Sequence, residues 1–197
     1  YRTNNNAAYV QLDKKFFGRL NISGGVRYEQ NKLDGPEAVI DGRDTLRVEG
    51  GVSKESKPVF RLGANLQLGK ATFLRSSWGQ GYRYPTIAEK YISTTSGALL
   101  IRPNPTLTSE TGWTAEIGIK QGYQFNRFQG FLDVALFWSE YQDMMEFQLV
   151  ALPPAFKSVN IGDTRIRGVD ISLAGQGNLG NGTASLLAGY TFIDPIF

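Results

Sequence analysis

The chain has 197 residues, of which 41% are hydrophobic and 20% charged, with a formal net charge of +3 and a mean hydropathy of -0.25. It contains no run of about 18 apolar residues, which excludes a membrane-spanning helix, and its Lys and Arg are scattered among acids, which argues against nucleic acid as a partner. Cysteine and histidine are both absent, so we exclude disulfides, expect no cofactor and no metal site, and disfavour an enzyme.

Alternation of apolar and polar residues with a period of two recurs along the chain and predicts β-strands. Eight segments show it, at residues 7–13, 20–29, 59–68, 71–78, 111–121, 128–139, 168–173 and 183–192. In the third, Phe60 and Leu62 alternate with Arg61 and Gly63. The charged residues fall on the face opposite the apolar one, so Asp133 is expected to point inward.

The predicted connections alternate between short and long. Short turns are expected at residues 14–18, 69–70, 122–127 and 175–182, and long connections at 31–57, 79–110 and 141–156. The first long connection reads as an exposed loop with a small hairpin around residues 39–48, and Asp194-Pro195 is expected to open a further loop. The alternation of short and long connections is typical of outer-membrane barrels, which have short periplasmic turns and long outer loops. A soluble antiparallel sandwich would also alternate, but it does not require short and long connections to segregate by end.

Aromatic residues fall on the apolar face near the long-connection ends of the strands. Indole and phenol rings favour the interface between hydrocarbon and lipid headgroups, so this placement predicts a membrane-interface girdle. The girdle residues are Tyr28, Trp78, Trp113, Trp138 and Tyr190.

Two runs carry a family resemblance. The first holds Gly79, Gly81, Pro85, Asn104, Pro105, Leu107 and Glu110, and the second holds Asn160, Gly162 and Gly168. In this order they resemble the barrel of TonB-dependent outer-membrane receptors, which often show a Gly-aromatic-Arg-x-Pro run followed by Asn-Pro-x-Leu-x-x-Glu. The chain departs from that pattern at Tyr82, where Phe is frequent, and at Lys90.

The resemblance implies an all-β, antiparallel, up-and-down transmembrane β-barrel in the bacterial outer membrane, with about eight strands present out of 22. Residues 1–197 would then be a partial barrel, without the signal peptide, the plug domain and the remaining strands. The implied function is import of a scarce ligand (siderophore-iron, vitamin, saccharide or peptide) with inner-membrane energy. The implied partners are outer-membrane lipid, the plug domain of the same precursor and a TonB-type energy-transducing protein.

Five residues of the first run are candidate ligand contacts at the receptor mouth, because aromatic and Arg side chains supply much contact energy. They are Tyr82, Arg83, Tyr84, Glu89 and Tyr91. We favour the interpretation that Arg83 and Glu89 pair to brace the loop and that Pro85 fixes its bend.

Two other functions stay open on the sequence alone. A passive porin-like or structural barrel would conduct ions without an energised partner. An outer-membrane hydrolase would need an inward residue such as Ser77 or Asp133 to act without histidine. No catalytic residue is expected.

Overall fold

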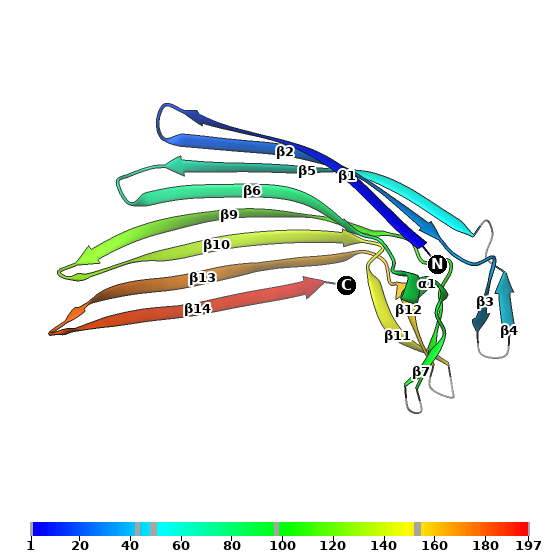
Figure 1. Cartoon of the computed structure of the whole chain (residues 1–197). Coiled ribbons are helices and arrows are strands. Elements are labelled where there is room, and N and C mark those ends of the chain that lie inside the picture. The colour runs from blue at the N-terminus through cyan, green and yellow to red at the C-terminus, as the bar shows by residue number, and fades with distance from the viewer. Residues whose placement is uncertain (1, 42–43, 48–50, 97–98, 152–154, 197) are drawn as a thin grey trace.

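The structure is a computed structural model that describes residues 2–41, 44–47, 51–96, 99–151 and 155–196. Eight long strands form one antiparallel sheet, in which each strand lies beside its neighbours along the chain, and β1 and β14 are the edges. Figure 1 shows them side by side in a curved layer. They are β1 (Arg2–Phe16), β2 (Leu20–Asp34), β5 (Val52–Gln67), β6 (Thr72–Arg83), β9 (Glu110–Phe125), β10 (Phe128–Gln142), β13 (Thr164–Leu179) and β14 (Gly182–Ile196). The predicted all-β, up-and-down antiparallel fold is confirmed.

The remaining elements all lie in the long connections, which gather at one end of the long strands (Figure 1). They are β3 (Ala38–Asp41), β4 (Asp44–Arg47), α1 (Ile87–Tyr91), β7 (Thr94–Ser96), β8 (Leu99–Arg102), β11 (Met145–Ala151) and β12 (Ala155–Asn160). The hairpin expected around residues 39–48 is confirmed in its described part, since β3 pairs with β4. A four-stranded sheet, β11-β12-β8-β7, joins the second long connection to the third. Among the described residues, no helix is long and apolar enough to cross a membrane.

The alternation of short and long connections is confirmed. Residues 17–19, 68–71, 126–127 and 180–181 make the short ones, whereas residues 35–51, 84–109 and 143–163 make the long ones. Positive φ angles reverse the chain at Gly18 (68°), Asn126 (54°) and Gly180 (61°). Glycine and asparagine adopt this left-handed region most readily, which explains their place in the turns.

The predicted strands were too short, mainly at the long-connection end. The expected loop at residues 31–57 is wrong at both ends, because β2 continues to Asp34 and pairs with β5 from Val52 onward. Polar residues occupy both faces there, for example Asn31 on one face and Lys32 on the other, so the period-two signal disappears. The ladder persists because it is made by backbone groups, which pair whether or not a face is apolar.

Several predicted turns are wrong for the same reason. The long connection expected from Gly79 onward is wrong at its start, because Gly79 and Gly81 lie inside β6, which runs on to Arg83. The turns expected at 122–127 and 175–182 shrink to two residues each, and the segment 14–18 is strand as far as Phe16. The loop expected at Asp194-Pro195 is part of β14, an edge strand that tolerates a missing backbone donor. The connection expected at 141–156 contains β11 and the start of β12.

The two faces of the long sheet differ in chemistry. Cross-strand partners put Leu62, Trp78, Ala115 and Trp138 in one row on one face. On this outward face large apolar side chains are exposed, among them Val10, Val26, Phe60, Leu62, Ile117, Leu136 and Tyr190. The opposite, inward face holds the paired charges described below.

The outward aromatic residues follow a line that is oblique to the strands. Followed from strand to strand through the cross-strand partners, Tyr190 on β14 is level with Leu20 on β2. The partners in between are Ile171, Val134, Ile119, Leu74 and Leu66. Leu20 lies eight residues before Tyr28 on β2. Eight residues cover about 26 Å, and the six strand steps from β2 to β14 cover about 29 Å. If both tyrosines lie at one membrane depth, the strands tilt by about 42°, within the range of known barrels.

Candidate functional site

The candidate site is a network of side chains in the long connections at one end of the sheet. It begins with α1, which follows directly on β6 and was expected as plain loop. The Thr86 hydroxyl accepts from the Glu89 backbone N–H at 3.2 Å, and the Glu89 carboxylate accepts from the Thr86 N–H at 2.7 Å. This reciprocal capping box starts the helix. The Thr-x-x-Glu spacing was the sequence signal that could have revealed it.

Arg83 links the end of β6 to two carboxylates. Its Nη1 lies 3.0 Å from a Glu89 oxygen, and its Nε lies 3.6 Å from a Glu110 oxygen. Glu110 in turn accepts from the Met145 backbone N–H at 3.1 Å, so it connects β9 to the start of β11. Burial raises the pKa of the Glu89 carboxyl, but the hydrogen bonds from Thr86 and Arg83 outweigh it, and its pKa lies below the ordinary value.

The inner side of α1 is buried against β2. Tyr91, Leu33 and Val39 form a hydrophobic cluster with Ile87 at its border. Tyr91 is only 4% exposed, so its ring offers no surface to a ligand in this conformation. Burial raises the pKa of its hydroxyl. A Cβ at Gly35 would lie 2.5 Å from the Tyr91 ring, which explains the glycine there.

Lys90 carries a buried amine in the same helix. Its Nζ donates to the Leu107 carbonyl at 2.9 Å, and burial lowers its pKa, an effect that the nearby Glu55 opposes. The Ser109 hydroxyl also donates to Glu55. Lys90 and Glu55 therefore tie α1 and the segment before β9 to the inward face of β5.

The Asn-Pro-x-Leu segment closes over the helix. Asn104 donates its backbone N–H to the Glu89 carbonyl at 2.9 Å and its side-chain amide to the Ser158 carbonyl at 2.8 Å. Leu107 donates its N–H to the Asn104 carbonyl at 3.1 Å, and its side chain is 1% exposed. Pro103, which precedes Asn104 in the chain, is also among the most deeply buried side chains of the described residues. Leu107 is thus the packed centre of the network.

Asn160 brings the two family-like runs together. Its amide oxygen accepts from the Thr108 N–H at 3.0 Å, and its amide nitrogen donates to the carbonyls of Thr108 (3.2 Å) and Asp143 (2.6 Å). One side chain therefore joins the second long connection to both ends of the third. Gly162, which follows, has a φ of +100° that favours glycine.

Tyr82 and Tyr84 stand beside this network. Their rings meet edge to face with centroids 4.8 Å apart, and the Tyr84 hydroxyl donates to the Glu55 carbonyl at 3.3 Å. Both are partly exposed, and Arg83 is exposed. Pro85 is buried at the bend. Of the five candidate ligand contacts, Tyr82, Arg83, Tyr84 and Glu89 therefore retain exposed surface, whereas Tyr91 is buried.

The inward face of the sheet carries paired charges. Arg75 bonds Glu116 and lies 3.0 Å from the Asp133 carboxylate, which confirms that Asp133 points inward. The Lys120 amine lies 3.6 Å from the centroid of the Phe131 ring. Further along, the Phe137 ring occupies the space that a Cβ at Gly168 would need. The wall is polar, but its charges are largely satisfied within it.

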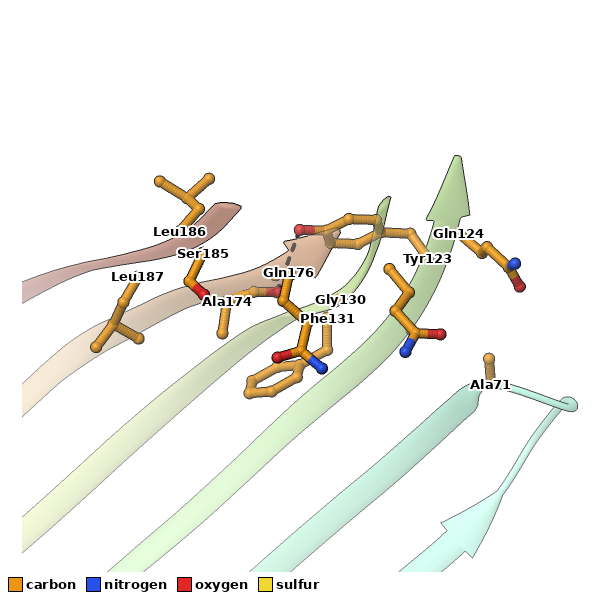
Figure 2. Close-up of a pocket in the computed structure, with 13 residues that line it drawn as sticks. Ala71, Tyr123, Gln124, Gly130, Phe131, Ala174, Gln176, Ser185, Leu186 and Leu187 are labelled. Atoms are coloured by element: carbon orange, nitrogen blue, oxygen red, sulfur yellow. Dashed lines mark hydrogen bonds between the residues drawn. The ribbon is translucent and has the colours of Figure 1, made fainter. Parts of the chain in front are cut away.

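A pocket of about 630 Å³ lies at the opposite, short-turn end. Figure 2 shows Tyr123 above the strands and Phe131 below them, so the pocket has residues from both faces of a single layer. The Tyr123 hydroxyl donates to the Ala174 carbonyl at 3.1 Å, and the ring covers Gly130 and Gly175. We interpret this feature as aromatic packing over glycines and not as a ligand site.

The five predicted girdle residues all lie on the long strands. Trp78 and Trp138 lie level with each other on either side of Ala115. Trp113 lies two residues nearer the long connections on β9, and Tyr28 and Tyr190 follow the oblique line. The Trp138 indole donates to Glu140 at 3.1 Å. Their depth in a membrane stays a prediction.

An antiparallel meander with an apolar outer face, a polar inner face and long connections at one end is the wall of a transmembrane β-barrel. The family description "TonB dependent receptor-like, beta-barrel" matches residues 1–196. The chain belongs to this family of outer-membrane transport receptors. No curated protein was found to match the chain.

Solved structures with the same fold are TonB-dependent receptors and metal transporters. A double mutant of the Serratia marcescens hemophore receptor HasR, in complex with its hemophore HasA and heme, has a TM-score of 0.74 at 20% identity, and the match covers 96% of this chain and 34% of HasR. The copper transporter OprC has a TM-score of 0.68 at 17% identity, with 96% and 30% covered. The FrpB iron transporter of Neisseria meningitidis (F3-3 variant) has a TM-score of 0.63 at 18% identity, and the match covers 98% of this chain and 26% of FrpB. The chain thus spans about a third or less of these proteins.

Proposed function

We propose that this chain is a wall and mouth segment of a longer TonB-dependent receptor, which imports a scarce ligand across the bacterial outer membrane with energy from the inner membrane. One observation carries the proposal: the long connections are fastened to each other and to the inward face of the sheet at a single end. A passive channel does not require such a built mouth, whereas a receptor must hold its ligand-facing surface in place.

The proposal includes partners that lie outside the 197 residues. A plug domain of the same precursor would fill the lumen beside the Arg75 and Lys120 wall, and a TonB-type protein would pull on that plug. The small share of each related structure that the chain covers supports a longer precursor.

The ligand class follows from what the relatives bind and from the mouth of this chain. The related solved proteins include a hemophore receptor in complex with heme, a copper transporter, an iron transporter, an uptake receptor for ferric yersiniabactin and a receptor bound to pyoverdines. Tyr82 and Tyr84 offer two partly exposed phenol rings at the mouth, which suit an aromatic-bearing iron chelate, while the Arg83 guanidinium is held by Glu89 and Glu110. We therefore place siderophore-iron ahead of vitamin, saccharide and peptide.

The test uses the complete receptor in a bacterium lacking its other iron receptors. Uptake of labelled ferric siderophores should require both the receptor and a functional TonB-type protein, and it should stop when the proton gradient is collapsed. Ligand flux or ion conductance that persists without energy would contradict the proposal and support a passive channel.

A further inference from the structure

Above the aromatic line, the outward face of β1, β2 and β5 carries cations. Lys32 and Lys54 are direct cross-strand partners, and Arg2 lies across from Asp34 in the adjoining ladder. Like charges placed directly opposite each other repel and destabilise a sheet unless an anion lies between them. The Lys32–Lys54 pair therefore requires a nearby anion.

The neighbours of Lys32 and Lys54 establish their direction. Leu33 packs against Tyr91 of α1, and Glu55 receives the Ser109 hydroxyl from the mouth network. Successive side chains of a strand point to opposite faces. Lys32 and Lys54 consequently point away from the lumen, toward the surroundings of the barrel.

The local charge is not balanced. Lys32 lies 3.0 Å from Asp34, but among the described residues neither Arg2 nor Lys54 has a carboxylate partner. Three cations thus share one carboxylate, which leaves an excess of two positive charges. Both Arg2 and Lys54 are exposed.

A second outward group of cations provides a contrast within the same sheet. On β13, Arg165 lies 2.9 Å from Glu140 and Arg167 lies 2.8 Å from Asp194. Arg165 also stands over the Trp138 ring, 5.2 Å from its centroid. These charges are satisfied within the protein, so of the two groups it is the β1-β2-β5 group that lacks enough carboxylate partners among the described residues.

The height of the group matches lipid phosphates. Lys32 lies 32 - 28 = 4 residues beyond Tyr28 on β2, which is about 13 Å along the strand and, at a tilt of about 42°, about 10 Å along the membrane normal. A lysine side chain can reach back several ångströms toward the interface with its apolar stem on the barrel. Its amine then lies where the headgroups of the outer leaflet begin.

We propose that Arg2, Lys32 and Lys54 bind the phosphate groups of a phosphorylated glycolipid in the outer leaflet of the membrane. The cations neutralise the phosphates, and the apolar face below, around Val26 and Phe60, contacts the acyl chains. The inference rests on the membrane location in the proposed function but not on ligand import.

The experiment uses the complete receptor in detergent, titrated with bisphosphorylated lipid A and followed by native mass spectrometry. A matched lipid A with the same acyl chains but no phosphates is titrated in parallel. The variant is Lys32→Gln with Lys54→Gln. The control is Lys57→Gln on the same strand, which lies opposite Glu29 on the inward face.

Each basic residue near an anionic membrane surface contributes roughly a fivefold factor in binding, so the double variant should bind bisphosphorylated lipid A roughly thirtyfold more weakly. Lys57→Gln should bind like wild type, and wild type should bind dephosphorylated lipid A more weakly still than the double variant binds the bisphosphorylated lipid, because the double variant keeps Arg2. Equal binding of the two lipids by wild type, or equal loss in Lys57→Gln, would overturn the proposal.

Inorganic phosphate separates a lipid site from a general phosphate site. Millimolar phosphate should leave the lipid A complex intact, because it lacks the acyl contacts, whereas full displacement would overturn the lipid assignment. Energised uptake is measured separately on the same variants. A Lys32→Gln, Lys54→Gln variant that loses lipid binding but keeps energised uptake supports the lipid site independently of ligand import. Absence of energised uptake by the wild-type receptor would contradict the proposed function and leave the lipid measurement unaffected.

Discussion

Replacing Leu107 by alanine tests whether packing, and not backbone bonding, holds the mouth together. The side chain is 1% exposed, and the Leu107 carbonyl and N–H keep their partners in the variant because they belong to the backbone. Removing a fully buried leucine side chain costs about 2–5 kcal/mol. A value of about 3 kcal/mol corresponds to a local opening equilibrium raised somewhat over a hundredfold.

The assay is amide hydrogen exchange of the complete receptor in a lipid bilayer, followed by mass spectrometry. Peptides covering residues 99–110 and 155–160 should lose protection, whereas a peptide covering residues 113–121 of β9 should not change. Leu149→Ala is the matched control, since Leu149 is 56% exposed in β11 of the four-stranded sheet at the same end of the barrel wall. It should alter protection by less than about 0.5 kcal/mol.

Two results would refute the reasoning behind this prediction. If exchange in Leu107→Ala rises equally in β9, the connections and the barrel wall open as one unit, and the network has no local stability of its own. If exchange stays at the wild-type level everywhere, the segment is held by hydrogen bonds alone. Both outcomes are visible in the same experiment.

Three further changes probe the rest of the network. Gly35→Ala places a Cβ where the Tyr91 ring lies, 2.5 Å away, so proteolytic cleavage near α1 should accelerate; an unchanged rate would contradict the packing. Asn160→Ala removes four hydrogen bonds, three of them to Thr108 in the second long connection and one to Asp143, which should weaken protection of residues 104–110 by about 1–3 kcal/mol; equal protection would show that these bonds contribute nothing. The lowered pKa of Glu89 means that its stabilisation is present above the ordinary carboxyl pKa and is lost as pH falls through the folded value. Protection of α1 should therefore decline below about pH 4 in wild type, whereas Glu89→Gln, which keeps the cap, should show no such decline; matching pH profiles would exclude the carboxylate as the cause.

The sequence predicted the membrane-facing part of each strand because a bilayer imposes a chemical rule on alternate residues. Val26 and Tyr28 obey that rule, and their strand was found. Beyond the membrane both faces of a strand meet water, so residues such as Asn31 and Ser53 carry no periodic signal although the backbone ladder continues. Strand identity was therefore predictable, and strand length was not.

The mouth network shows a different limit. Its parts were visible in the sequence as two family-like runs, and the Arg83–Glu89 pair was expected as a brace of the loop. The contacts of Asn160 were not predictable, since they join segments up to 52 residues apart through backbone groups that any residue carries. A five-residue helix such as α1 is too short for a periodic pattern, and only its capping box could announce it.

The oblique aromatic line makes a final prediction about the position of the whole wall in the membrane. Tyr28 and Tyr190 are offset by eight residues in the register, so untilted strands would place their rings about 26 Å apart in depth. A tilt of about 42° brings them to one level. Tyr28→Trp and Tyr190→Trp, each made in the complete receptor with its other tryptophans replaced by Phe, report that depth through quenching by lipids labelled at different positions. Both should match the same quencher position. Depths that differ by more than about 10 Å would show that the two rings do not share one interface, and the height assigned to Lys32 and Lys54 would then be wrong as well.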